Sequence, residues 1–95
     1  MTIKEKILNS VELTLEEVME IVWGDAEELE IVEEVRRDEL KWHEVTDVVF
    51  KVEERFFMVF YYRGLGYHGE NNYEEQVAVE VKPVQVLRTE WVEKE

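Results

Sequence analysis

His43, Glu44 and Asp47 form the pattern H-E-x-x-D, which differs by one residue type from the zinc-protease pattern H-E-x-x-H. The zinc pattern needs two imidazoles four residues apart on one helix face, with the glutamate as general base. Here a carboxylate replaces the second imidazole, and the following residues, VTDVVF, favour a strand. We therefore expect no metal site and interpret His43 as an ordinary residue at the entry of a strand.

The segment 64–75, GLGYHGENNYEE, is the one substantial loop that the sequence predicts, and it is rich in oxygen and nitrogen ligands. It lacks the D-x-D-x-D-G spacing of a calcium loop, so turn-forming Asn and Gly explain its composition more simply. Tyr67 and Tyr73 are of more interest, because tyrosine supplies a large contact area at low entropic cost. They could anchor a protein partner, or at least one of them could pack into the core.

Other catalytic chemistry has little support. Ser10 is the only serine and has no nucleophile-elbow glycines around it, and the chain has no cysteine. No G-x-x-x-x-G-K phosphate loop occurs. Carboxylates are so numerous that no pair stands out as a general acid and base. We predict a protein that is not an enzyme and uses no cofactor.

Residues 12–34, ELTLEEVMEIVWGDAEELEIVEE, include ten acidic residues and no basic one. On a helix, Glu12, Glu16 and Glu20 would share one face, and each like-charged i, i+4 pair destabilises a helix by about 0.2 to 0.5 kcal/mol. A solubilising surface would account for this stretch, and so would a docking surface for a basic partner. The residues that we predict to bind the partner are Glu16, Glu20, Trp23, Glu27, Glu28, Glu30, Tyr67 and Tyr73.

The net charge of −13 restricts the class of partner. Such a charge repels nucleic acid and anionic membranes, and it attracts basic surfaces over a Debye length of about 8 to 10 Å. The longest apolar run, 56–62, is far shorter than the roughly 20 residues of a membrane helix, and the N-terminus lacks a signal-peptide pattern. We expect a cytoplasmic protein that binds no nucleic acid or membrane directly.

A chain of 95 residues with 45 % apolar residues forms a single domain, 1–95, around one core. Thr14 and Glu17 have the spacing of a capping box, and the apolar residues after them recur at helical spacing as far as a stop at Gly24. The segment 3–8 is either a short additional helix or a frayed end.

The central part of the chain predicts strands. Residues 48–52 and 56–62 form a hairpin pattern that is rich in β-branched and aromatic residues. Both faces of 56–62 are apolar, so we expect a central strand that is covered on both sides, by the helix and by a curled sheet or a second subunit. In the last strand Val77, Val79 and Val81 share a face, and a bend at Pro83 would shift the following residues to the opposite parity.

Residues 26–37, AEELEIVEEVRR, fit two elements. Intrinsic propensity favours a second helix, whereas a strand would add a member to the sheet and lead directly into the next one. We favour the strand, with Leu29, Ile31 and Val35 facing inward.

The run from about residue 36 to 92 resembles small acidic proteins encoded by bacteriophages. The likeness rests on Trp42 before the first strand, a D-V-x-F strand from Asp47 to Phe50, and the aromatic pair Phe56 and Phe57. A polar loop, 70–76, and a V-x-P-V-x-V ending, 81–86, complete it. The resemblance implies a phage or prophage protein that acts in a bacterial cytoplasm, and proteins of that kind are often inhibitors of host or defence enzymes.

We therefore predict an α+β domain with an N-terminal helix packed on an antiparallel sheet of about four strands. The predicted function is a non-enzymatic, phage-encoded inhibitor that binds a basic surface of a host nucleic-acid-binding or defence protein. It would act by steric block or nucleic-acid mimicry, as anti-CRISPR or anti-restriction proteins do. The alternatives are a structural homo-oligomer, such as a homodimer, and a protein that sequesters a small ligand such as a nucleotide in a pocket. That pocket would be lined by Tyr61, Arg63, Tyr67, His68 and Tyr73.

Overall fold

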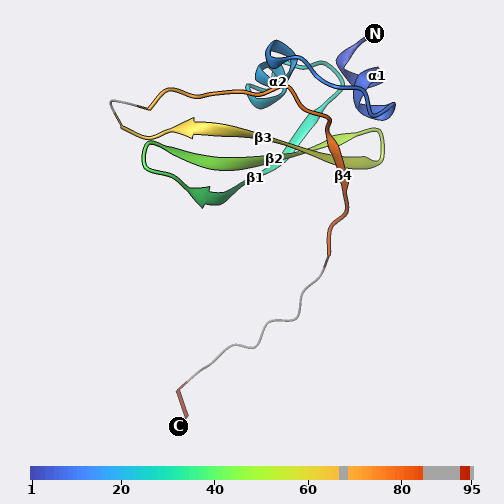
Figure 1. The fold of residues 1–95 in the computed structure, drawn as a ribbon. Helices are drawn as coiled ribbons and strands as arrows, with labels where there is room; N and C mark the ends of the chain where they lie inside the picture. Colours follow the sequence, from blue (N-terminus) through green and yellow to red (C-terminus); the bar gives the residue numbers. More distant parts are fainter. Residues whose placement is uncertain (67–68, 85–92, 95) are drawn as a thin grey trace.

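The fold has two layers, with two short helices lying over one face of a four-stranded antiparallel sheet (Figure 1). The computed structural model describes residues 1–66, 69–84 and 93–94. The elements, in chain order, are α1 (Ile3–Leu8), α2 (Leu15–Val22), β1 (Glu30–Glu39), β2 (His43–Val52), β3 (Arg55–Gly64) and β4 (Val79–Val81). The strands lie side by side in the order β1-β2-β3-β4. The predicted α+β class is confirmed.

The helix α2 begins and ends where the sequence predicts. Thr14 Oγ1 accepts a hydrogen bond from the Glu17 N–H at 3.2 Å, and the Glu17 carboxylate accepts one from the Thr14 N–H at 2.9 Å. This is the predicted capping box. Gly24 follows the helix with a φ of +78°, a left-handed conformation that a side chain would strain. The segment 3–8, which the sequence left open, forms the helix α1.

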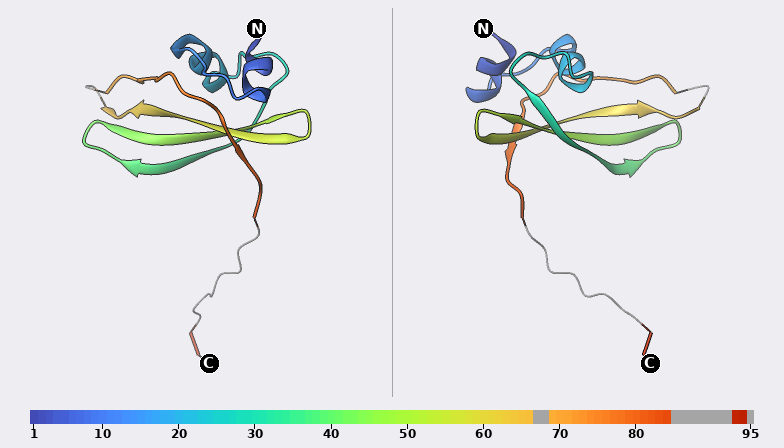
Figure 2. Two further views of the ribbon diagram at one scale, coloured as in Figure 1. Left: turned by 45° about the vertical axis from the view of Figure 1, so that its right-hand side comes forward. Right: turned by 180° about the vertical axis from the view of Figure 1, so that it is seen from behind.

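Both views in Figure 2 show the helices over one face of the sheet. The buried side chains of the core lie between these two layers. Phe50 and Phe57 are opposite each other in the register of β2 and β3, and their rings stack with centroids 6.2 Å apart. Burying a large apolar side chain of this kind contributes about 1.5 to 3 kcal/mol. The buried residues are Ile7, Leu13, Val18, Ile21, Val22, Ala26, Val48, Phe50, Val52, Phe57, Val59, Tyr61 and Ala78.

The segment that fits either helix or strand forms β1, so the choice of a strand is confirmed, although its apolar residues are not buried. Ile31 is 37 % exposed and Val35 is 41 % exposed, and only Leu29 packs partly against the core. Ile31 lies opposite the buried Phe50, on the helix side as predicted, so the prediction that all three face inward is wrong only for Val35. Two register shifts against β2 flank the segment 33–36, and Val35 lies opposite Asp47 on the face away from the helices. Bulges of this kind bend and twist an edge strand away from regular alternation.

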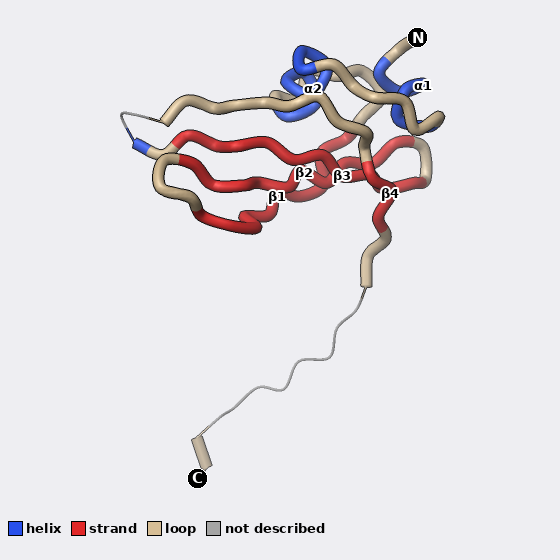
Figure 3. The backbone as a smooth tube through the Cα atoms, in the orientation of Figure 1, coloured by secondary structure: helices blue, strands red, loops and turns tan. Residues whose placement is uncertain are grey.

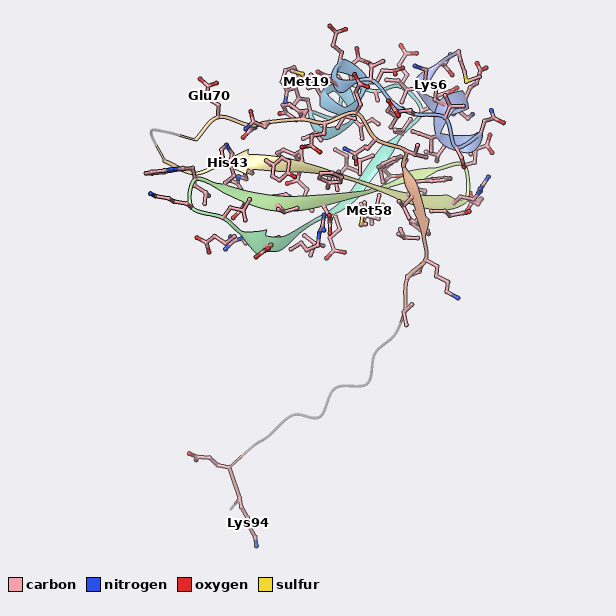
Figure 4. The ribbon with its side chains drawn as sticks, viewed as in Figure 1. Lys6, Met19, His43, Met58, Glu70 and Lys94 are labelled. Carbon is pink, nitrogen blue, oxygen red and sulfur yellow. The ribbon has the colours of Figure 1, made fainter. Side chains whose placement is uncertain are left out.

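The hairpin of β2 and β3 is confirmed, with β3 between β2 and β4. The helix layer covers one face of β3 as predicted, and in the described part of the chain no curled sheet covers the other face, so a second subunit remains the predicted cover. Phe56, Met58 and Phe60 are only half-buried, and no described segment lies over them. Figure 4 shows Met58 on the side of the sheet opposite to the helix layer, which carries Met19 and Lys6. We call this surface the open face.

The last strand is shorter than predicted. Val79 and Val81 share the open face, opposite Met58 and Phe56, but Val77 precedes the strand. The strand ends two residues before Pro83. The predicted continuation through residues 85–92 lies outside the described residues.

Gln76 joins the helix layer to the sheet edge. Its main chain forms a bridge with Leu13, in which Leu13 N–H donates to Gln76 O at 2.8 Å and Gln76 N–H donates to Leu13 O at 3.3 Å. Its side-chain amide accepts from Phe60 N–H and donates to Phe60 O, both at 2.8 Å. The amide thus takes the place of a neighbouring strand between Asn72, which bridges Tyr62, and β4. Figure 3 shows the main chain of this segment running along the sheet as a loop before it enters β4.

We expect Gln76→Ala to lower the free energy of unfolding by about 2 kcal/mol, because two hydrogen bonds to the main chain of β3 are lost. Denaturant unfolding followed by circular dichroism measures this change. Glu74→Ala is the matched control, since only the main-chain oxygen of Glu74 contacts Gln76, at 3.1 Å. Equal unfolding midpoints for the two variants would show that the side-chain amide does not hold this edge.

Candidate functional site

A hollow in the helix layer lies where the end of α2 meets the N-terminal residues. Its volume is about 540 Å³. It is lined by Thr2, Ile3, Glu20, Trp23, Asp25 and Glu27. We call it the acidic hollow, because three of its six lining side chains are carboxylates and none is basic.

The local fold places these carboxylates on the surface. After α2 the chain turns at Gly24, and the buried Ala26 fixes the following residues against the core. Asp25 and Glu27, on either side of Ala26, remain exposed. Because Ala26 is buried between them, Asp25 and Glu27 both point outward and line one side of the acidic hollow, and Glu20 of α2 lines another.

Trp23 is an exposed aromatic residue whose ring is held in place by Tyr73. It is 57 % exposed, and its indole N–H donates to the Tyr73 hydroxyl at 2.9 Å. The two rings meet edge to face, with centroids 6.2 Å apart. Tyr73 in turn stacks on the buried Tyr61, with centroids 5.5 Å apart and 11° between the planes. Trp23 is therefore anchored through Tyr73 to β3.

The stack of Tyr61 and Tyr73 also bears on the alternative of a small-ligand pocket. The two rings lie against each other and so occupy the space that a ligand would need between them. Burial raises the pKa of the Tyr61 hydroxyl, and the nearby Glu34 carboxylate adds to the effect, so this phenol is neutral at pH 7. Tyr67 and His68, which were predicted to line the same pocket, lie outside the described residues.

Two lysines of α1 neutralise some acids of the helix layer. Lys4 Nζ lies 3.2 Å from Glu53 and 3.5 Å from Glu28, and these carboxylates raise its pKa, Glu53 more strongly. Lys6 Nζ lies 2.6 Å from the Glu17 carboxylate. Within the part of the chain that the structure describes, no cation forms an ion pair with any carboxylate of the acidic hollow.

The predicted binding residues thus divide into groups. Glu20, Trp23 and Glu27 line the acidic hollow, and Tyr73 supports it. Glu28 faces Lys4 instead. Glu16 on α2 and Glu30 at the start of β1 are exposed but do not line the acidic hollow. Tyr67 lies outside the described residues.

Sequence reasoning missed Asp25 as part of this site, and it named Tyr61, with Tyr73, only for the alternative ligand pocket. Asp25 directly follows the helix-stopping Gly24, and this position in the turn was the available signal. The contact of Tyr61 with Tyr73 joins β3 to the loop that follows it, and no local pattern predicts it.

The H-E-x-x-D residues diverge. Glu44 is buried on the helix side of β2, between Arg36 at 2.9 Å and Arg63 at 3.5 Å. Asp47 lies on the open face, 3.1 Å from Arg37. The His43 ring contacts the Glu70 carbonyl and the Asn72 amide (Figure 4 shows His43 and Glu70). Since Glu44 and Asp47 occupy opposite faces, these residues cannot surround one ion.

The glycines of the 64–75 loop match the spacing G-x-G-x-x-G at Gly64, Gly66 and Gly69. In dinucleotide-binding proteins this pattern opens a helix whose N-terminus receives the phosphates. Here the chain after Gly69 runs extended, and Asn72 bridges Tyr62 of β3. A Cβ atom at Gly64 would collide with the main chain of Gly69, so these two glycines allow the loop to fold closely on itself.

Two carboxyl groups meet where the loop passes the start of α2. A shared hydrogen bond with Glu75, together with the charge of Glu75, raises the pKa of Glu12. The opposite holds for Glu17, where burial opposes ionisation but hydrogen bonds from Lys6 and Thr14 outweigh it and lower the pKa. Like charges are therefore crowded at Glu12 and compensated at Glu17.

We expect Glu75→Gln to raise the melting temperature at pH 7. A raised pKa of Glu12 means that the folded state binds a proton more readily than the unfolded state, so the carboxyl pair destabilises the fold when ionised. The gain should shrink as the pH falls through the raised pKa of Glu12 towards the ordinary Glu value of 4.5, and it should vanish below that value, where both groups are protonated. Glu74→Gln changes the net charge equally without touching Glu12. A similar gain from both variants in a thermal melt would contradict the specific repulsion.

Comparisons of the chain with protein-family models, curated proteins and solved structures find no match. In the described ranges, no helix is both long enough and apolar enough to cross a membrane. The function must therefore be argued from the geometry and charge of the acidic hollow.

Proposed function

We propose that this protein is a non-enzymatic inhibitor that binds a basic, nucleic-acid-binding surface of another protein through the acidic hollow. The observation that carries the proposal is the combination of three exposed carboxylates with an exposed, anchored tryptophan. The carboxylates of Glu20, Asp25 and Glu27 have no described cation to neutralise them, although lysines nearby neutralise Glu17 and Glu28.

An arginine or lysine side chain suits this hollow chemically. A guanidinium can stack on the face of an indole and donate paired hydrogen bonds to a carboxylate, and the acidic hollow offers both groups. Trp23 is held by Tyr73 before any partner arrives, so little side-chain entropy is lost on binding. Buried tryptophans at interfaces are often worth 2 kcal/mol or more.

The wider charge distribution favours a partner that normally binds nucleic acid. With a net charge of −13, the protein attracts a basic groove before contact and increases the association rate. The carboxylates would then lie where phosphates lie in the natural complex, so binding would exclude DNA or RNA. The resemblance to acidic phage proteins agrees with such a role in a bacterial cytoplasm, against a host or defence enzyme.

The test is a capture experiment from bacterial lysate with two triple variants of equal charge. Neutralising the hollow with Glu20→Gln, Asp25→Asn and Glu27→Gln should release a partner that wild-type protein retains. The control Glu39→Gln, Glu54→Gln and Glu70→Gln removes three charges that do not line the acidic hollow, and it should retain the partner. Trp23→Ala should weaken binding about tenfold or more.

Competition completes the test. Added duplex DNA or RNA should displace the protein from its partner, because both would occupy one surface. Equal retention by the two triple variants would mean that the acidic hollow is not the binding site. Retention that nucleic acid does not affect would rule out mimicry.

A further inference from the structure

The outer edge of β1 is a second surface suited to an interaction. All ten residues of β1 are exposed, and none of the described segments pairs with its outer side. An edge of this length presents unpaired N–H and C=O groups, which proteins usually protect with charges or bulges. β1 has both charges and bulges, and the order of its charges indicates which strand could pair with it.

The charges of β1 are self-complementary. Its centre reads Glu33-Glu34-Val35-Arg36-Arg37, with two acids before the valine and two bases after it. If two copies of β1 pair antiparallel about Val35, Glu34 lies opposite Arg36 of the second copy and Glu33 lies opposite Arg37. The twofold symmetry repeats both contacts. Opposite charges directly across two strands stabilise the pair, whereas most other strands would meet a mismatch.

The side chains also lie on the required faces. Glu34 and Arg36 oppose Val48 and Thr46, whose side chains are buried on the helix side, so both point to that side of the sheet. Glu33 and Val35 lie on the open face, opposite Val49 and Asp47.

Arg37 joins them on the open face. It contacts Asp47 at 3.1 Å and lies over the ring of Phe60, 5.7 Å from its centroid. Each proposed charge pair therefore meets on a single face of the extended sheet.

The strand is regular over most of the segment that would pair, and Arg37 lies in the second register shift. The register shifts against β2 lie before Glu33 and after Arg36, which leaves the segment 33–36 unbroken. Glu33 and Glu34 form no ion pair within the described residues. Arg36 and Arg37 contact acids of β2, but their side chains remain 65 % and 54 % exposed, and a guanidinium has five donors to share.

We infer that β1 pairs antiparallel with β1 of a second copy of this chain, centred on Val35, to form a dimer with one continuous eight-stranded sheet. In this pairing, Glu34 of one copy and Arg36 of the other both point to the helix side of their own sheets. The helix layers of the two copies therefore lie on the same side of the joined sheet. A dimer of this form presents two acidic hollows in one direction. The pairing stands independently of the function proposed for the hollows.

The decisive test is sedimentation of the full chain over a concentration series with two double Lys variants. Glu33→Lys with Glu34→Lys should weaken dimerisation at least about tenfold, because lysine then opposes arginine at four places. Glu16→Lys with Glu20→Lys, on α2, is the control. Each Glu→Lys substitution makes the net charge of −13 less negative by two, so both double variants change the charge equally. If general repulsion between copies controlled association, both variants would therefore associate more tightly than the wild type. Only the paired pattern predicts opposite directions.

Further measurements separate the alternatives. Wild-type amides within 33–37 should exchange hydrogen more slowly as the protein concentration rises, and circular dichroism should confirm that every variant is folded. A wild-type protein that stays monomeric to about 200 µM would overturn the proposal. A dimer that survives the double substitution Glu33→Lys with Glu34→Lys would also overturn it. So would a dimer that this double substitution leaves intact but that Val79→Lys, on the open face, abolishes.

Discussion

The bridge between Leu13 and Gln76 fixes the helix layer to the edge of the sheet, beside the apolar core that both layers share. Its main-chain hydrogen bonds tie the start of α2 to the segment before β4, while the Gln76 amide holds that segment against β3. Leu13 is fully buried at the same point. The junction acts together with the apolar core between the layers and with the Lys4–Glu53 ion pair, which also join the helices to the sheet. The acidic surface of the helix layer is therefore held in place largely by contacts that carry no charge.

The distribution of charge gives this small fold two unlike surfaces. Acids gather in the helix layer, where Lys4 and Lys6 compensate only part of them, and Glu12 and Glu75 are so close that the pKa of Glu12 rises. The open face carries mainly apolar side chains, and Arg37 and Asp47 form an ion pair on it. Two short helices cover one face of the sheet, and within the described residues nothing covers the other. Binding through one surface and self-association through β1 can therefore occur together.

Local rules predicted local structure well. The spacing of Thr14 and Glu17 predicted the capping box, and the alternation in 56–62 predicted which residues of β3 share a face. The errors arose where distant segments decide the outcome. The exposure of Ile31 and Val35 follows from bulges and an edge position that β1 does not reveal in its own residues. The stack of Tyr61 on Tyr73 depends on the return of the chain alongside β3, where Asn72 bridges Tyr62. The acidic hollow was half-predicted, because Glu20 and Glu27 were named but Asp25 was not, and the ion pair that turns Glu28 towards Lys4 was not foreseen.

The separation in sequence between Leu13 and Gln76 has a kinetic consequence. The β2–β3 hairpin closes through a turn at Glu53 and Glu54, and hairpins of this type form within microseconds. The Leu13 bridge joins the two ends of the described fold, and contacts of such long separation form late. The helix layer is thus expected to dock last and to detach first. A protein that captured it would lengthen the lifetime of the folded state as well as occupy a surface.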